Sequence, residues 1–199
     1  YDKPIAIALG FFDCIHTGHA LLVENVKKFA KDNGVESALL TFSNDPNEFF
    51  GKDKQICTFE NRLFILEKLG LDEVIGAKFN EEFMSTSPQG FLDKLTGNFD
   101  VKCIVVGADY TFGKNAGGNV DMLKNYCKFH GIVLNVVPFE TVCGEKLSTT
   151  YLKSLVKSGE VKKLNSHLAV PYFMSGVVQH ARHKGTGMGF PTVNIAPDS

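Results

Sequence analysis

Apolar residues recur along this chain in two alternating patterns, short continuous runs and longer stretches with helical spacing. The short runs predict five strands, at residues 5–9, 37–42, 74–79, 103–107 and 132–138. The helical stretches predict a helix that opens near Gly18 and further helices at residues 60–69, 88–95, 120–129 and 151–157. The run at 103–107 contains no polar residue, which is typical of a parallel strand covered on both faces. Strands that alternate with helices in this way predict an α/β fold, with a doubly wound, Rossmann-like parallel sheet.

The character of the sequence changes near Pro171. Beyond this point helical spacing is lost, and strand-like segments at 173–178 and 192–195 flank a glycine-rich loop. We therefore expect a first domain over residues 1–168 and the incomplete start of a β-domain over residues 169–199. About 30 residues cannot bury a core of their own, so the second domain is expected to be cut short here or ordered only in part.

The composition of the chain limits the kinds of molecule that it is expected to bind. The chain has 199 residues, and 21 Lys and Arg against 22 Asp and Glu give a net charge of −1, so no basic patch indicates nucleic-acid binding. No apolar run is long enough to span a membrane. The five cysteines form no C-x-x-C pair and their number is odd, which favours reduced, buried thiols in a cytoplasmic protein. We expect small-molecule substrates, and the oligomeric state is left open.

The most informative stretch is the turn after the first predicted strand. Gly10 ends that strand, and the following helix opens with His16 and His19, three residues apart and separated by a glycine. A strand, turn and helix in this order form a phosphate site in open α/β sheets, because the helix N-terminus offers unpaired N–H groups and partial positive charge. The two histidines can also be helix-start residues bonded locally, or half of a metal site. A metal needs three or four ligands, and no third ligand has matching spacing, so we predict no side-chain metal site in the first domain.

The segment GFFDCIHTGH, residues 10–19, resembles the opening of the FMN adenylyltransferase module of bacterial bifunctional riboflavin kinase/FAD synthetases. The resemblance implies that His16 and His19 are catalytic and stabilise charge on the α-phosphate of ATP while the phosphate of FMN attacks. It also implies that neighbouring residues of the turn lie at the nucleotide and its phosphates. Asp13 can instead be a residue that only shapes the turn. Cys14 stands where the family usually has Gly. The implied nucleotide neighbours in this turn are Gly10, Phe11, Asp13 and Gly18.

Two later segments resemble the same family in the same order. GADYTFG at 107–113 implies that Asp109 contacts the nucleotide, through its ribose, and that Tyr110 and Phe112 border the flavin. The alternative is a strand-ending turn with Phe112 packed inside. LSTTYLK at 147–153 implies that three residues hold the outer phosphates, although Ser148 or Thr149 can be a plain helix cap. The third residue is Lys153 in place of the family's Arg, and it keeps the charge without the two-pronged donor geometry.

The loop after the second predicted strand corresponds to a family loop that lines the site, with Asn44 and Asp45 as flavin-site candidates. The final segment, GTGMGFPTVN at 185–194, resembles the riboflavin kinase motif in which a Thr and an Asn help to hold Mg-ATP. In this chain those residues are Thr192 and Asn194, whereas His180 and His183 are expected at the surface. The resemblance also implies that residues 169–199 are the incomplete start of a riboflavin kinase-like β-barrel domain.

The resemblance implies synthesis of FAD by transfer of AMP from Mg-ATP to FMN, with ATP and FMN as substrates and Mg²⁺ as the metal. It further implies that the intact protein also phosphorylates riboflavin, an activity expected only when the full C-terminal domain is present. Two alternatives remain open at this point. One is an adenylyltransferase for another phosphorylated acceptor, such as phosphopantetheine or nicotinate mononucleotide. The other is a flavin- or nucleotide-binding protein that has lost catalysis.

Overall fold

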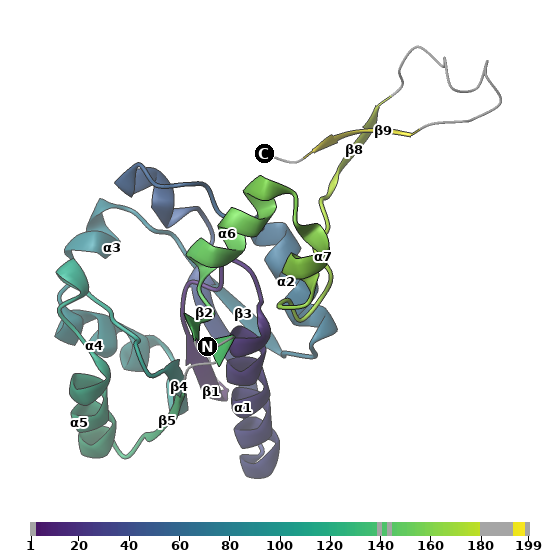
Figure 1. The fold of residues 1–199 in the computed structure, drawn as a ribbon. Helices are drawn as coiled ribbons and strands as arrows, with labels where there is room; N and C mark the ends of the chain where they lie inside the picture. Colours follow the sequence, from purple (N-terminus) through teal and green to yellow (C-terminus); the bar gives the residue numbers. More distant parts are fainter. Residues whose placement is uncertain (1–2, 139–140, 143–144, 180–192, 198–199) are drawn as a thin grey trace, which may run out of the picture.

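The fold is built around a five-stranded parallel sheet with strand order β3-β2-β1-β4-β5 (Figure 1). The computed structural model describes residues 3–138, 141–142, 145–179 and 193–197. The five strands are β1 (Pro4–Leu9), β2 (Glu36–Phe42), β3 (Glu73–Ala77), β4 (Asp100–Gly107) and β5 (Val133–Val137). All neighbouring pairs run parallel, which confirms the predicted α/β class.

Helices cover both faces of this sheet, as predicted for a doubly wound fold (Figure 1). On one face, α1 (Thr17–Asn33), α2 (Phe59–Lys68), α6 (Thr149–Ser158) and α7 (Val161–Asn165) share a core with Ala6 and Ala8 of β1. On the other face, α4 (Pro88–Asn98) and α5 (Val120–His130) pack against Ile5, Ile7 and Leu9. Alternate residues of β1 thus point into opposite cores, which is why the strand is a continuous apolar run.

Several short elements have no counterpart in the predicted set. They are η1 (Pro46–Phe50), α3 (Glu81–Ser85), η2 (Lys114–Ala116) and the small pair β6 (Thr141–Val142) and β7 (Glu145–Lys146). The α3 helix has no buried residue, and Asn80 caps it by accepting a hydrogen bond from the backbone N–H of Phe83. Elements of two to five residues are too short to show hydrophobic periodicity, so the sequence pattern could not reveal them.

The chain beyond α7 first returns to the first turn of the protein. The backbone N–H of Thr17 donates to the carbonyl of His167, and the N–H of Ala169 donates to the carbonyl of Ile15. The antiparallel hairpin of β8 (Gly176–Gln179) and β9 (Asn194–Pro197) then extends away from the sheet layers (Figure 1). The hairpin agrees with the predicted strand-like segments, and the domain boundary after residue 168 stays a prediction.

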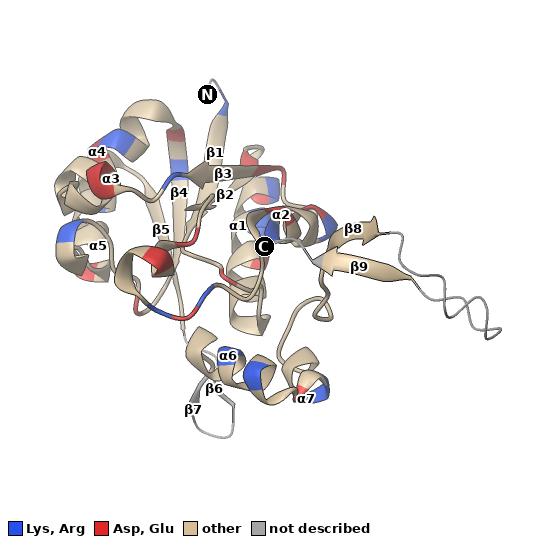
Figure 2. Cartoon of the chain, turned by 90° about the horizontal axis from the view of Figure 1, so that it is seen from above, with Lys and Arg blue, Asp and Glu red and all other residues tan. Residues whose placement is uncertain are grey.

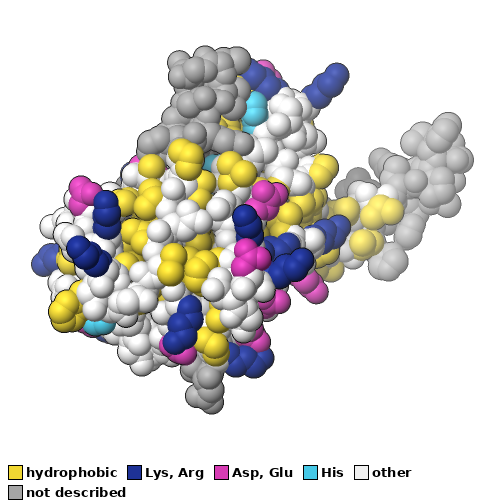
Figure 3. Space-filling model, turned by 90° about the horizontal axis from the view of Figure 1, so that it is seen from below, with side chains coloured by type: hydrophobic (Ala, Val, Ile, Leu, Met, Phe, Trp, Pro, Cys, Tyr) yellow, Lys and Arg dark blue, Asp and Glu magenta, His cyan; other side chains and the backbone are white. Residues whose placement is uncertain are grey.

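Acidic and basic residues are interspersed over the helices (Figure 2). On the face seen in Figure 3, side chains of both signs surround an area of apolar side chains. In the part of the chain described above, no helix is long and apolar enough to cross a membrane.

Candidate functional site

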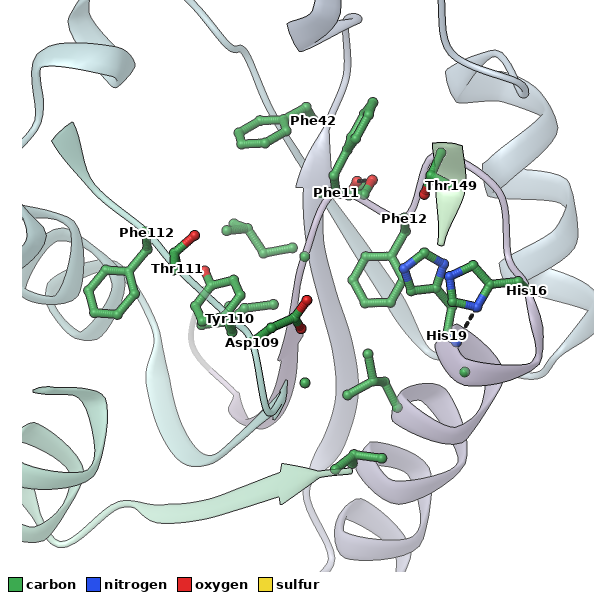
Figure 4. A pocket seen from close by; sticks show the side chains of 18 of the residues that line it. Phe11, Phe12, His16, His19, Phe42, Asp109, Tyr110, Thr111, Phe112 and Thr149 are labelled. Atoms are coloured by element: carbon green, nitrogen blue, oxygen red, sulfur yellow. Dashed lines mark hydrogen bonds between the residues drawn. The ribbon is translucent and has the colours of Figure 1, made fainter. Parts of the chain in front are cut away.

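A pocket of about 480 Å³ lies at the carboxyl edge of the sheet, where open α/β sheets hold their ligands. The turn after β1 and the start of α1 form one wall, and the segment after β4 forms the opposite wall. Figure 4 shows Asp109 and Tyr110 facing the two histidines and Phe12 across the pocket. The sequence-predicted residues that line it are Gly10, Phe11, His16, Gly18, His19, Asp109, Tyr110, Phe112, Ser148 and Thr149.

The two histidines are stacked, with ring centroids 3.7 Å apart, and each is held by the backbone. His16 is the N-cap of α1, and its Nδ1 accepts a hydrogen bond from the backbone N–H of His19 at 3.2 Å. The Nδ1 of His19 lies 2.6 Å from the carbonyl oxygen of Cys14. Burial lowers the pKa of His19 to about 4, against the hydrogen bond to Cys14 and the charge of Asp109, which raise it. His19 is therefore neutral near pH 7.

The start of α1 retains a donor for an anionic ligand. The N–H groups of Thr17, His19 and Ala20 donate to protein acceptors, whereas the N–H of Gly18 has no partner among the residues described. The helix has 17 residues, so its dipole also favours negative charge at this end. This combination of free N–H, helix dipole and imidazole groups can bind a phosphate.

The turn before α1 has a strained backbone at Phe12, whose side chain is tightly packed. Phe12 has a φ of 53°, a left-handed conformation that is uncommon for a residue other than glycine. Its buried ring packs against His19, with centroids 4.7 Å apart. A Cβ at Gly10 would come within 2.8 Å of that ring, so the glycine leaves room for Phe12. The ring of Phe12 in turn supports the imidazole of His19.

The rest of the pocket is largely aromatic. Tyr110 stacks on Phe112 at 5.6 Å, and Phe112 contacts Phe91 at the same centroid distance. Phe83 of α3 meets Phe42 of β2 edge to face at 5.1 Å. Flat apolar rings of this kind fit a planar aromatic ligand. The sequence indicated Tyr110 and Phe112, but Phe42, Phe83 and Phe91 come from three other elements and were missed as lining residues.

The residues at the N-terminus of α6 both cap this helix and line the pocket. Ser148 is the N-cap of α6, and its Oγ accepts a hydrogen bond from the N–H of Tyr151 at 3.3 Å. Ser148 and Thr149 also line the pocket. The two sequence interpretations of this segment, a helix cap and a phosphate contact, are therefore compatible.

Asp13 and Lys153 lie behind the turn and do not line the pocket. Asp13 is buried, and its Oδ1 accepts a hydrogen bond from the N–H of Ile56 at 2.5 Å. The Nζ of Lys153 lies 3.4 Å from Oδ2 of Asp13 and donates to the backbone carbonyl of Asp53 at 2.8 Å. Burial raises the pKa of Asp13, and the N–H of Ile56 and the charge of Lys153 oppose that rise. This pair joins the first turn to α6 and to the loop before α2.

Asn44 and Asp45 also face protein backbone and not the pocket. Asn44 exchanges two hydrogen bonds with the backbone of Phe79, at 2.9 and 2.7 Å. Asp45 is the N-cap of η1, and its carboxylate accepts from the N–H groups of Asn47 and Gln55 at 2.9 and 2.7 Å. Both side chains fix loops beside Phe42.

Arg62 is a buried residue of the site region that the sequence interpretation missed. It lies in α2 with 0% exposure, and its Nη1 donates to the carbonyl of Phe11 at 3.1 Å and to Oγ1 of Thr41 at 2.9 Å. Its Nη2 donates to the carbonyl of Phe42 at 2.8 Å. One guanidinium thus ties the turn after β1 to the end of β2. A signal was present, because Arg62 occupies the apolar face of its helix with Ile65 and Leu66.

Among the described residues, no group of three or more His, Cys, Asp or Glu side chains could hold a metal ion. Asn194 is exposed and pairs with Gln179 in the hairpin. Thr192, His180 and His183 lie outside the described residues.

The sheet order, the helices on both faces and the pocket at the carboxyl edge define a Rossmann-like α/β protein with a ligand site at the N-terminus of its first helix. Residues 1–151 match the family described as FAD synthetase, and residues 168–199 match the one described as riboflavin kinase. The chain belongs to the FAD synthetase family.

Individual relatives agree with this assignment. The bifunctional riboflavin kinase/FMN adenylyltransferase of Bacillus subtilis is 32% identical over 194 residues, which cover 95% of this chain and 61% of the relative. The bifunctional riboflavin kinase/FMN adenylyltransferase of Listeria monocytogenes is 32% identical over 198 residues, which cover 98% of this chain and 63% of the relative. A crystal structure described as a macrolide-efflux protein from Streptococcus pneumoniae superposes with a TM-score of 0.85 at 27% identity, covering 99% of this chain and 65% of that one. The chain thus spans about three fifths of the length of the two curated relatives.

Proposed function

We propose that this chain catalyses the adenylyltransferase step of FAD synthesis, transferring AMP from Mg-ATP to FMN with release of pyrophosphate. The observation that carries the proposal is the placement of His16 and His19 at the α1 N-terminus, in one pocket with an aromatic wall. The first feature suits a phosphate, and the second suits the flat ring of a flavin or an adenine. Membership of the FAD synthetase family supports the same pair of substrates.

The reaction needs no nucleophile from the protein. A phosphate oxygen of FMN attacks the α-phosphorus of ATP and forms the new P–O bond as the bond to the pyrophosphate oxygen breaks. Negative charge on the α-phosphate oxygens is stabilised by donors that are already in place. His16 is such a donor, because its Nδ1 is occupied as an acceptor and its proton resides on Nε2. The N–H of Gly18, which has no acceptor among the described residues, is another.

We assign the remaining pocket residues the roles that the family resemblance implies, and their position in the pocket supports these roles. Asp109 holds the ribose, Ser148 and Thr149 hold the outer phosphates, and Tyr110 and Phe112 border the flavin. Mg²⁺ enters as part of the Mg-ATP substrate, carried by the phosphates.

The candidates outside the pocket act from behind it. Asp13, Asn44 and Asp45 support the loops that shape the pocket. Lys153 reaches an outer phosphate only after its ammonium leaves the carboxylate of Asp13 and the carbonyl of Asp53.

We also propose that this chain, when joined to a full riboflavin kinase domain, phosphorylates riboflavin. The support is the match of residues 168–199 to the riboflavin kinase family. In that activity Thr192 and Asn194 help to hold Mg-ATP.

The direct test is incubation with FMN, ATP and Mg²⁺, with FAD and pyrophosphate followed by chromatography. We expect the two products in equal amounts, and no adenylylated product from phosphopantetheine or nicotinate mononucleotide. His16→Asn is a matched variant, because Asn is a favourable N-cap and keeps the bond to the N–H of His19. It lacks the Nε2–H, so turnover should fall about 10²–10³-fold while the fold persists. Saturable binding of both substrates without FAD would refute the catalytic proposal.

A further inference from the structure

The two stacked histidines offer the same ring atom, Nε2, to a ligand, but with and without a proton. The Nδ1 of His16 accepts a hydrogen bond from a backbone N–H, so a neutral His16 carries its proton on Nε2 and can donate it. The Nδ1 of His19 faces a carbonyl oxygen at 2.6 Å. A carbonyl can only accept, so Nδ1 of His19 must carry the proton. A neutral His19 is therefore left with a bare lone pair on Nε2.

This lone pair is the atom that His19 offers to the pocket. His19 lines the pocket, and its Nε2 has no hydrogen-bond partner in the described part of the chain. Phosphate oxygens are acceptors as well, so a neutral His19 and a phosphate would place two acceptors against each other. His16 beside it has no such conflict.

His19 cannot resolve the conflict by moving its own proton from Nδ1 to Nε2. That tautomer would set the Nδ1 lone pair against the carbonyl oxygen of Cys14 at 2.6 Å, and this carbonyl would keep only the bond from the backbone N–H of His16. The ring is also held between His16, at 3.7 Å, and Phe12, at 4.7 Å. A second proton on the ring satisfies both the carbonyl and the phosphate.

We propose that His19 takes up one proton from solution when a nucleoside triphosphate binds in this pocket. The inference rests on the proposed function, since the ligand is the ATP of that reaction. Proton uptake turns His19 from an acceptor into a cationic donor only while the triphosphate is present. The empty site thereby avoids holding a buried charge.

The charges around His19 agree with a neutral ring in the free protein. Asp109, across the pocket, is the acidic group whose charge acts on His19, and burial outweighs it. The carboxylate of Asp13 is engaged by Ile56 and Lys153 behind the turn. From α6, the pocket-lining residues are the uncharged Ser148 and Thr149. The incoming phosphates therefore supply the negative charge that retains the second proton.

Calorimetry tests this coupling. Binding of Mg-ATP without FMN is measured in two buffers with different ionisation enthalpies near neutral pH, and we expect uptake of about one proton per site. Linkage also requires the Kd for Mg-ATP to increase as the pH is raised, by up to tenfold per pH unit, between the pKa of His19 in the free protein and its higher pKa in the complex. In His19→Asn, the amide can still donate to the Cys14 carbonyl but cannot be protonated, so binding should proceed without uptake. His130→Asn, outside the pocket at the end of α5, should keep the uptake.

A second measurement does not depend on any variant. In protein labelled with ¹⁵N-histidine, the Nε2 resonance of His19 should move from the position of a bare imidazole nitrogen to that of an imidazolium when Mg-ATP is added. Mg-ATP binding without proton uptake, or uptake that persists in His19→Asn, would overturn the inference while the proposed function stands. Absence of any Mg-ATP binding would overturn both.

Discussion

Replacing Arg62 by methionine should be among the most destabilising single changes in this protein. Arg62 is wholly buried and donates four hydrogen bonds, to the carbonyls of Phe11 and Phe42 and to the side chains of Thr41 and Gln55. Bonds from a charged donor are worth about 1.5–3 kcal/mol each, which gives a gross loss of about 6–12 kcal/mol.

Two effects reduce this gross figure. Removal of the guanidinium also removes the cost of burying its charge, several kcal/mol, and that burial already lowers the pKa of Arg62. The carbonyl of Phe11 additionally keeps the hydroxyl of Thr41 as a donor. The carbonyl of Phe42 loses the bond from Arg62. We therefore expect a net loss of about 3–5 kcal/mol, because each buried acceptor left without a donor costs about 1–3 kcal/mol.

The assay is guanidinium unfolding followed by far-UV circular dichroism, since the chain has no Trp to report by fluorescence. Lys68→Met is the matched control, because it removes a cation from the exposed side of the same helix. Lys68 lies over the ring of Phe64 at 4.4 Å, and an exposed contact of this kind is worth about 0.5–1 kcal/mol. A loss for Arg62→Met no larger than for Lys68→Met would refute the argument that this guanidinium holds the two segments together.

Three smaller predictions concern packing, thiol reactivity and pH. Gly10→Ala should cost about 1–3 kcal/mol, seen as a lower unfolding midpoint, because its new Cβ meets the ring of Phe12 at 2.8 Å. Burial raises the pKa of Cys57 to about 12, so Ellman's reagent near pH 8 should label this thiol only after denaturant is added. Hydrogen bonds from Ser37 lower the pKa of Asp72 in the folded state. The stability that these bonds supply is therefore fully present above the pKa of Asp72 in the unfolded chain, about 4, and is lost as the pH falls through the pKa of Asp72 in the folded protein. Asp72→Asn should therefore flatten the acid limb of the stability profile.

Each of these has a control within the chain. Gly97→Ala, in α4 with nothing within 4 Å of the new Cβ, should not destabilise, and equal losses at both glycines would rule out the contact with Phe12. Rapid native labelling of Cys57, located by mass spectrometry, would contradict its burial. An unchanged acid limb in Asp72→Asn would show that the bonds from Ser37, at 2.6 and 2.9 Å, carry no pH dependence.

The sequence predicted the strands well because strand burial leaves a direct mark on the pattern of apolar residues, whereas the strand order was not predicted. The apolar run at 103–107 is the buried half of β4, and the alternation that places Ile5 and Ala6 in opposite cores needs no polar residue. The placement of His16 followed as well, since a helix that begins after a strand-ending turn sets its first residues at the carboxyl edge of the sheet.

Side-chain direction was harder to predict from sequence, because it depends on partners far along the chain. Asn44 turns to the backbone of Phe79 only because β2 and β3 are neighbours, and Phe83 reaches the pocket from a five-residue helix without apolar periodicity. Asp45, by contrast, could have been identified as a cap, because an Asp before Pro46 is a common helix start.

Lys153 shows how a motif and a structure give different kinds of information about one residue. Its position in the LSTTYLK segment suggests a cation near the outer phosphates, whereas its ammonium lies 3.4 Å from the buried carboxylate of Asp13. If Lys153 moved to a phosphate, Asp13 would lose its ion pair within a site where burial already disfavours its charge. The proton that Asp13 could then accept would partly offset that loss. Arg62 and Lys153 thus hold the turn after β1 from behind, while His16 and His19 of the same wall face the pocket.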